Sequence, residues 1–238
     1  MMSRSIGKKH VVLIILFFLC ACGQRSIVAP VEELNWRARH YAARHVVVRG
    51  ETLYAIAFRY DRDYRQLAQM NHLSRPYTLH VGQVIQLNPN GARATRRSRI
   101  RTTRYVPQAR PVMVPSKSRS GRWLWPVQGR VVANYAPQLG RKGIDIAGEK
   151  GSKIRASSSG VVAYAGSGLS GYGNLIIIKH DKQFMTAYGN NARNLVKEGQ
   201  FVKAGQVIGD VGVVDQRYWG VHFEIRYAGK PLNPRIYL

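Results

Sequence analysis

The chain has 238 residues, enough for one or two domains, and its hydrophobic fraction of 45% is ordinary for a globular protein. Its charge is not ordinary, because 37 basic residues against 12 acidic residues give a net charge of +25, which implies a polyanionic neighbour. The two cysteines, Cys20 and Cys22, both lie near the start, which excludes a fold stapled by disulfides further along the chain.

The first residues have the pattern of an export signal. Basic residues precede an apolar run over residues 11–19, which is too short to span a bilayer as a stable helix. The run ends in Leu19-Cys20-Ala21-Cys22, which resembles a bacterial lipobox. We therefore expect a lipoprotein signal peptide over residues 1–21 and lipidation of the Cys22 thiol; a plain cleaved signal peptide is the alternative. In a Gram-negative source, Gly23 after the lipidated cysteine points to the periplasmic face of the outer membrane.

After a tether over residues 22–44, residues 45–89 show the pattern of a small α+β unit. A strand at 45–48 is followed by a helix whose apolar face is Leu53, Ile56, Ala57 and Tyr60, with Thr52 as its N-cap. Asp63 with Gln66 is typical of the start of a second helix, and a Gly-Gln turn precedes a final strand at 84–87. The pattern Gly-Glu-Thr-Leu-x-x-Ile-Ala resembles a LysM module, a βααβ unit that binds peptidoglycan.

The LysM resemblance implies a binding groove for glycans that contain N-acetylglucosamine. It would lie between the turn at residues 50–53 and the segment 77–83. The residues that the resemblance assigns to glycan binding are Gly50, Glu51, Thr52, Leu53, Gly82 and Gln83.

Residues 90–122 are predicted to be a disordered linker. They contain ten Lys or Arg residues, three prolines and neither Asp nor Glu, so they cannot bury a core. Basic runs often bind nucleic acid, but an exported protein does not meet DNA. Anionic wall or lipid headgroups are therefore better partners, and a merely solvated spacer is the alternative.

Residues 123–238 are predicted to be mostly β. Short apolar runs at 160–165, 175–179 and 206–209 alternate with glycine turns. The segment 199–205 resembles a hairpin turn of lipoyl-type domains, and about 115 residues suffice for one β core.

Three segments of this region keep the spacing of known zinc-peptidase motifs: Arg141 to Asp145 that of His-x-x-x-Asp, Tyr188 to Asn190 that of Tyr-x-His, and Gly220 to His222 that of His-x-His. In this order they resemble the LytM/lysostaphin-type zinc peptidases, which cut peptidoglycan peptides. In that family the positions of Arg141, Asp145 and His222 bind zinc, and those of Asn190 and Gly220 are histidines that assist the reaction. Here only Asp145 and His222 keep the family's residue types. The resemblance therefore implies a mostly-β, LytM-like domain whose active site is degenerate.

The chemistry of these residues argues against a peptidase. A catalytic zinc needs three protein ligands and a water, whereas Asp145 and His222 supply two. Arg141 cannot bind a cation, because guanidinium has no free lone pair. We expect no metal, no cofactor and no catalytic residue in this chain. We also expect an ion pair between Arg141 and Asp145 in place of zinc, the alternative being that Arg141 points to solvent.

A lipobox, a LysM module, a basic linker and a degenerate LytM-like domain together resemble the NlpD-type lipoproteins. That resemblance implies an activator of a periplasmic zinc amidase that splits septal peptidoglycan during daughter-cell separation, with Asn190 and Trp219 as candidate partner-binding residues. Its partners would be peptidoglycan, the amidase and the outer membrane, and not nucleic acid. The alternatives are a zinc endopeptidase with an unusual ligand set and a non-catalytic tether between membrane and wall.

Overall fold

The computed structural model describes residues 42–88, 123–181 and 183–238. The predicted signal peptide, its lipidation site Cys22 and the linker predicted over residues 90–122 lie outside the described residues, as does the tether up to residue 41. Within the part that is described, no helix has the length and apolar character needed to cross a membrane.

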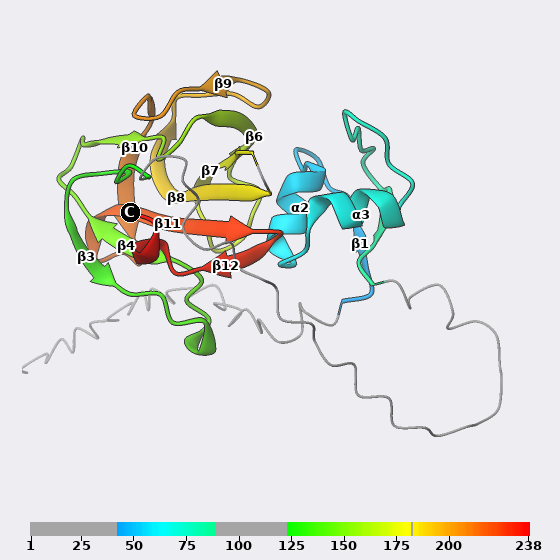
Figure 1. The fold of residues 1–238 in the computed structure, drawn as a ribbon, viewed down its shortest axis with the longest axis horizontal. Helices are drawn as coiled ribbons and strands as arrows, with labels where there is room; N and C mark the ends of the chain where they lie inside the picture. Colours follow the sequence, from blue (N-terminus) through cyan, green and yellow to red (C-terminus); the bar gives the residue numbers. More distant parts are fainter. Residues whose placement is uncertain (1–41, 89–122, 182) are drawn as a thin grey trace, which may run out of the picture. The chain divides into compact units, whose positions relative to one another are not determined.

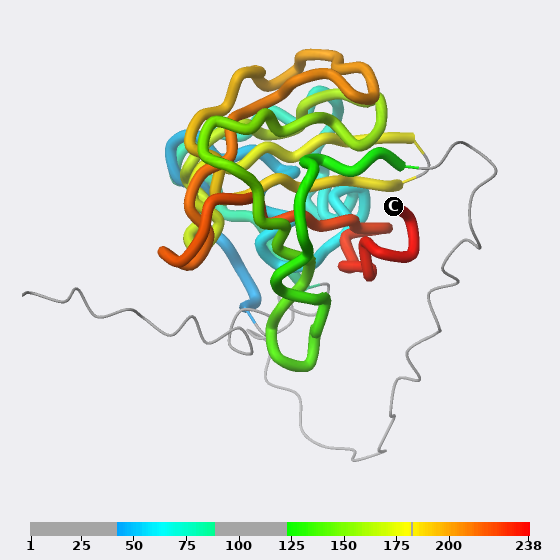
Figure 2. The backbone as a smooth tube through the Cα atoms, turned by 90° about the vertical axis from the view of Figure 1, so that its left-hand side faces the viewer, coloured from blue at the N-terminus to red at the C-terminus, as the bar shows by residue number. Residues whose placement is uncertain are grey.

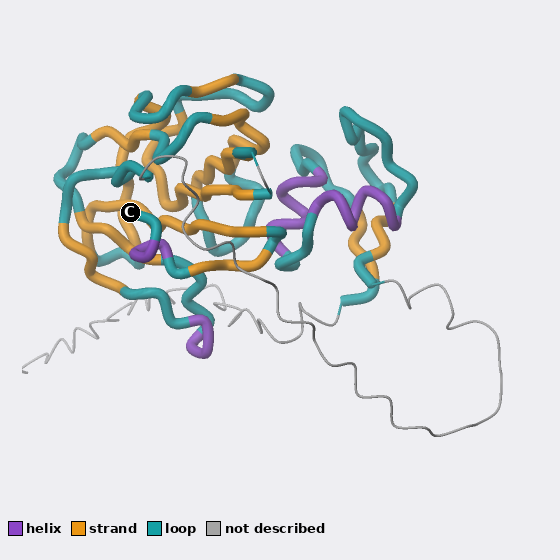
Figure 3. Tube along the Cα trace, in the orientation of Figure 1, coloured by secondary structure: helices purple, strands orange, loops and turns teal. Residues whose placement is uncertain are grey.

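The first described module has the predicted βααβ order. Strand β1 (Arg44–Val46) pairs antiparallel with β2 (Val84–Gln86), with His45 opposite Ile85. Helices α2 (Leu53–Arg59) and α3 (Tyr64–Met70) lie between them in the chain. Figure 3 shows that the longer helices of the described chain belong to this module.

Side-chain caps start both helices at the predicted residues. The Thr52 hydroxyl accepts a hydrogen bond from Ala55 N at 3.1 Å, and the Asp63 carboxylate accepts from Arg65 N at 2.7 Å. These bonds satisfy amides that the first helical turn leaves without partners. Asn71 ends α3 and ties it to the sheet, because its side chain bonds both N and O of Gln86. The helix boundaries are thus set by short polar side chains.

Residues 123–238 form a mostly antiparallel β structure, as predicted (Figures 1 and 3). Its main path runs β3-β4-β11-β10-β8-β7-β6-β9, with β5 paired to β10 and β12 paired to β11. The strands, in chain order, are β3 (Arg130–Ala133), β4 (Ile144–Ala147), β5 (Lys153–Arg155), β6 (Gly160–Gly166), β7 (Asn174–Lys179), β8 (Phe184–Asn194), β9 (Phe201–Val202), β10 (Val207–Val214), β11 (Tyr218–Tyr227) and β12 (Lys230–Leu232).

The core of this domain comes from the alternation of its strands. On β11, Val221, Phe223 and Ile225 are fully buried in one apolar cluster, which also contains Ile144 and Ile146 of β4. The loop with the 3₁₀ turn η2 (Pro137–Leu139) extends from the body of the domain (Figures 1 and 2). A second 3₁₀ turn, η3 (Pro234–Ile236), precedes the C-terminal residue pair.

A second apolar cluster joins the two modules. It contains the buried faces of α2 and α3 together with Leu169, Leu175, Ile177 and Met185 of the β domain. Phe58 of α2 is fully buried there, with its ring centroid 5.3 Å from that of Tyr172. The sequence pattern did not place Phe58 on the apolar face of α2, because a single LysM module would leave that side of the helix in water.

Candidate functional site

The strand register brings the dispersed motif positions together. On the β4–β11 pair, His222 lies directly opposite Asp145, and Gly220 lies opposite Ala147. On the β11–β8 pair, His222 lies opposite Gly189, next to Asn190. Residues that are far apart in sequence therefore share three adjacent strands, with β11 in the middle.

A network of polar contacts lies where these three strands meet. His222 Nδ1 lies 2.5 Å from Asp145 Oδ1, and His222 Nε2 lies 3.1 Å from Glu224 Oε1. The Tyr218 hydroxyl donates to the second oxygen of Asp145 at 3.2 Å, and the Tyr172 hydroxyl donates to Glu224 at 2.9 Å. The imidazole and the two phenols thus donate to the two carboxylates, and Arg226 is a further donor to Glu224.

This geometry favours a charged His222. Because both ring nitrogens face carboxylate oxygens, both must donate, which only the imidazolium form allows. Burial alone lowers the pKa of His222, but the hydrogen bonds to Asp145 and Glu224 outweigh burial and raise the pKa to about 9. Burial also acts to raise the pKa of Glu224, but the charges of Arg226 and His222 hold that pKa well below its usual range.

Arg141 does not replace a metal at this site. Its side chain is exposed at the base of the η2 loop, where its backbone is bridged to Ala136. Among the described residues, Asp145 takes its hydrogen bonds from His222 and Tyr218 and forms no ion pair with Arg141. The expected Arg141–Asp145 ion pair is therefore wrong, because a neighbouring strand already supplies a cation to the carboxylate.

The other two degenerate positions are shaped by backbone constraints. A Cβ atom on Gly220 would lie 2.3 Å from the carbonyl oxygen of Ile146, so a histidine fits there only if β4 and β11 separate. Asn190 has a φ of 59°, a left-handed conformation that asparagine tolerates better than most residues. Its backbone N–H donates to Tyr172 O at 2.7 Å.

These residues do not fit the zinc that the fold family implies. A histidine ligand must be neutral and must direct a lone pair at the metal, whereas both nitrogens of His222 are engaged as donors. At the third ligand position Arg141 offers only positive charge, and Gly220 has no room for the histidine that assists the reaction in the family. The donor set that remains is an ion-pair network rather than a metal centre.

The network continues into the LysM module through Arg226. The Arg226 guanidinium bonds Glu224 Oε2, Asp61 Oδ1 and the Phe58 carbonyl, each at 2.7 Å. Its Cζ lies 3.5 Å from the centroid of the Phe58 ring, and Lys142 holds Asp61 from the other side at 2.6 Å. The side chains of Arg226 and Glu224 are 0% exposed. The contacts therefore connect the degenerate site to α2 of the LysM module.

Sequence reasoning missed Glu224 and Arg226, although a signal was present. His222, Glu224 and Arg226 alternate with buried apolar residues along β11, so one face of a central strand carries three polar side chains. A charged face on a strand paired on both sides indicates buried partners. By the same alternation Trp219 lies on the opposite face, packed against the apolar cluster of Val221 and Phe223.

The residues predicted to bind glycan lie around the start of α2 and the turn before β2. Glu51, Thr52 and Leu53 line a cleft, together with Tyr54 and the segment 76–79. Gly50 and Gly82 have φ values of 80° and 86° and face open space, so they shape their turns. Whether these residues contact a glycan stays a prediction.

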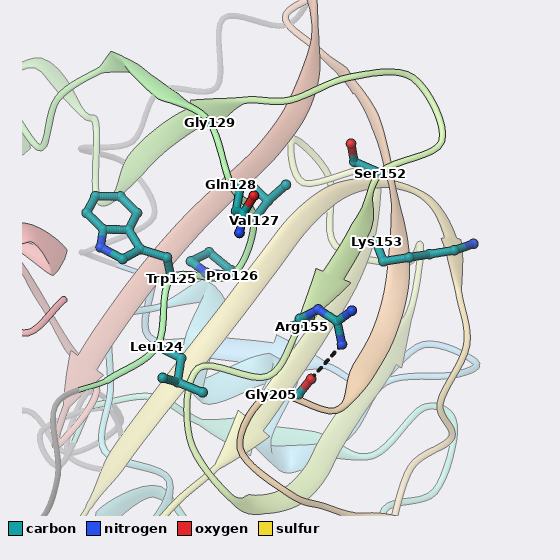
Figure 4. A pocket seen from close by; sticks show the side chains of 10 residues that line it. All are labelled: Leu124, Trp125, Pro126, Val127, Gln128, Gly129, Ser152, Lys153, Arg155 and Gly205. Carbon is teal, nitrogen blue, oxygen red and sulfur yellow. Dashed lines mark hydrogen bonds between the residues drawn. The ribbon is translucent and has the colours of Figure 1, made fainter.

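A larger surface pocket of about 840 Å³ lies elsewhere on the β domain (Figure 4). Its walls include Leu124, Trp125, Lys153 and Arg155, and Arg155 donates to the Gly205 carbonyl at 3.0 Å. None of the degenerate motif positions is among its lining residues.

Comparisons with known proteins agree with the two-module architecture. Residues 45–88 match the LysM domain, and residues 140–234 match peptidase family M23. The chain is 39% identical to the "Lipoprotein NlpD/LppB homolog" of Pseudomonas aeruginosa, over 83% of this chain and 77% of that one. It is 40% identical to the "Uncharacterized lipoprotein YgeR" of Escherichia coli, over 82% of this chain and 80% of that one.

A third relative carries a functional name. The "Murein hydrolase activator NlpD" of Salmonella typhimurium is 36% identical, over 82% of this chain and 67% of its own length. These relatives are named as a lipoprotein and as murein hydrolase activators. The chain, which joins a LysM module to a domain of peptidase family M23, belongs to the NlpD-type lipoproteins.

Proposed function

We propose that this protein is an outer-membrane lipoprotein that binds peptidoglycan and activates a periplasmic zinc N-acetylmuramoyl-L-alanine amidase for septal wall splitting. The observation that carries the proposal is the closed ion-pair network at the M23 motif positions, where His222 is held by Asp145 and Glu224. A site built this way lacks a metal ligand set and a free base for hydrolysis. The name of the related murein hydrolase activators supports an activating role.

The zinc and the hydrolytic chemistry would then belong to the partner enzyme. The face around His222 and Asn190 remains half-buried and available for contact. We propose that Asn190 touches the amidase, because it lies in β8 beside the network, is half-buried and has a polar side chain. Trp219 was a second candidate from sequence, and its packing against the core makes it the weaker choice.

An amidase assay tests the activator role. Dye-labelled sacculi are incubated with the purified chain, with a periplasmic zinc amidase, or with both, and released dye is measured. We expect no release by the chain alone and a faster release by the mixture than by the amidase alone. Asn190→Gly removes the side chain and accepts the left-handed backbone at this position, so it should reduce the stimulation while the melting temperature stays unchanged. Release by the chain alone that a metal chelator stops would show instead that the protein is a peptidase.

The lipid anchor is tested separately. Cys22→Ser removes the thiol that a thioether-linked diacylglycerol requires, so the variant should accumulate as an unprocessed or mislocalised precursor. Metabolic labelling with a fatty acid and membrane fractionation measure this, with Cys20→Ser as the matched control that should still be acylated. Normal acylation of the Cys22→Ser variant would contradict the assignment of Cys22.

A further inference from the structure

The LysM cleft has a second wall that the module does not itself supply. A cleft of about 350 Å³ has Thr52, Tyr54 and the segment 76–79 on one side. On the other side lie the segment 161–163 of β6, Lys179 at the end of β7, and the loop residues Glu198 and Gly199. Its volume is within the range of about 300–1,000 Å³ that is typical of small-ligand sites.

The LysM wall has the chemistry of a sugar-binding surface. The half-buried rings of Tyr54 and Tyr77 meet edge to face, with centroids 6.0 Å apart, and Tyr54 also packs on Tyr64 at 4.6 Å. Aromatic rings provide flat apolar area with a polar hydroxyl at one end, which suits the apolar face and polar rim of a pyranose. Thr78 adds a further exposed hydroxyl at the rim.

The wall from the β domain adds accessible charged groups, whereas the carboxylate of Glu51 on the LysM wall is 1% exposed and already paired with Arg59. Lys179 Nζ lies 5.7 Å from the centroid of the Tyr54 ring, so the cation stands beside the aromatic surface of the cleft. The exposed Glu198 accepts a hydrogen bond from Ala165 N at 3.3 Å, which leaves acceptor capacity on its carboxylate. A charged donor and a charged acceptor thus stand opposite an apolar platform.

The two walls are fixed relative to each other by direct bonds. The Thr52 hydroxyl, which caps α2, also donates to the Ala163 carbonyl at 3.2 Å. Beyond the cleft, Arg59 donates to the Gly168 carbonyl at 3.0 Å, and the Arg226 contacts hold the far end of α2. A ligand therefore enters a site whose two sides are already in position, which lowers the entropic cost of binding.

We propose that the glycan site of this protein is composite: an N-acetylated glycan segment lies between the two modules, with Lys179 and Glu198 of the β domain as direct ligands of its hydroxyl and acetamido groups. This inference rests on the proposed binding of peptidoglycan by the LysM module. Lys179 donates to sugar or acetamido oxygens, and Glu198 accepts from hydroxyl or amide hydrogens. The M23-type domain then contributes to wall binding as well as to activation.

Calorimetric titration of the full chain in detergent with an uncharged β-1,4-linked N-acetylglucosamine tetramer tests the inference. A neutral probe excludes attraction that arises only from the net charge of +25. We expect Lys179→Ala and Glu198→Ala each to weaken binding about tenfold, since hydrogen bonds to charged groups are the stronger ones. Lys197→Ala and Glu149→Ala make the same charge changes at exposed sites outside the cleft and should bind as the unaltered chain does.

Two further variants separate failure of the inference from failure of the proposed function. Tyr77→Ala reports on the LysM wall alone. The double variant Lys179→Gln/Glu198→Gln repeats the test on the other wall with side chains of similar length. Suppose that the tetramer binds, that Tyr77→Ala weakens this binding, and that the changes at Lys179 and Glu198 leave it unaltered. The composite site is then wrong, while glycan binding by the LysM module stands. If the unaltered chain binds neither the tetramer nor sacculi, the proposed glycan binding fails, and the composite site fails with it.

Discussion

Replacing Arg226 by methionine should lower the free energy of unfolding by about 3–5 kcal/mol. The guanidinium is 0% exposed and joins Glu224, Asp61 and the Phe58 carbonyl at 2.7 Å each. Methionine keeps much of the volume but leaves two carboxylates short of their partner. Removing one member of a buried ion-pair group costs far more than the group contributes as a whole, because the remaining charges stay out of water.

Urea unfolding followed by circular dichroism measures this change. Arg193→Ala is the matched control, because Arg193 also pairs with a carboxylate, Asp210, but its side chain is 67% exposed. That surface pair should contribute less than about 1 kcal/mol. Arg226→Lys should fall between the two, since an ammonium keeps the charge but loses the planar fork of donors. Equal effects of Arg226→Met and Arg193→Ala would contradict the buried network.

Stability should also fall as the pH rises from about 6.5 to beyond 9. His222 has a folded-state pKa of about 9, because its bonds to Asp145 and Glu224 outweigh the opposing effect of burial, against about 6.5 in an unfolded chain. A raised pKa means that the native state holds the proton more tightly. Its contribution is therefore fully present below about pH 6.5 and is lost as the pH passes through 9, by roughly 3 kcal/mol in total.

The pH prediction is measured as a difference between two proteins. The free energy of unfolding is determined by urea at several pH values between 6 and 10 for the unaltered chain and for His222→Gln. Glutamine keeps a donor but does not titrate, so the gap between the two curves should narrow towards high pH. Other groups that titrate in this range affect both proteins and cancel. Parallel curves over the whole range would show that His222 is not charged in the folded protein.

Local sequence determined the elements and showed where the residues depart from the family's motifs. Thr52 and Asp63 cap their helices at the expected places, because a cap bond spans only two or three residues. The alternation of apolar residues likewise indicated the strands of the β domain, since the period of a strand is local. The positions of Arg141, Asn190 and Gly220 within the motifs could be recognised from the sequence, because a motif is defined by the spacing of its residues.

Only the tertiary structure decided which charges meet. Asp145 was expected to pair with Arg141, four residues away, but β-strand register places His222 opposite it instead. Arg226 finds Asp61 across 165 residues of chain, and Phe58 is buried by a second module rather than by its own. Such pairings depend on strand register and on the packing of one module against another. Both are determined by many contacts between residues that are distant in sequence. The spacing of residues along the chain does not predict these pairings, because partners that are far apart in sequence produce no local periodicity.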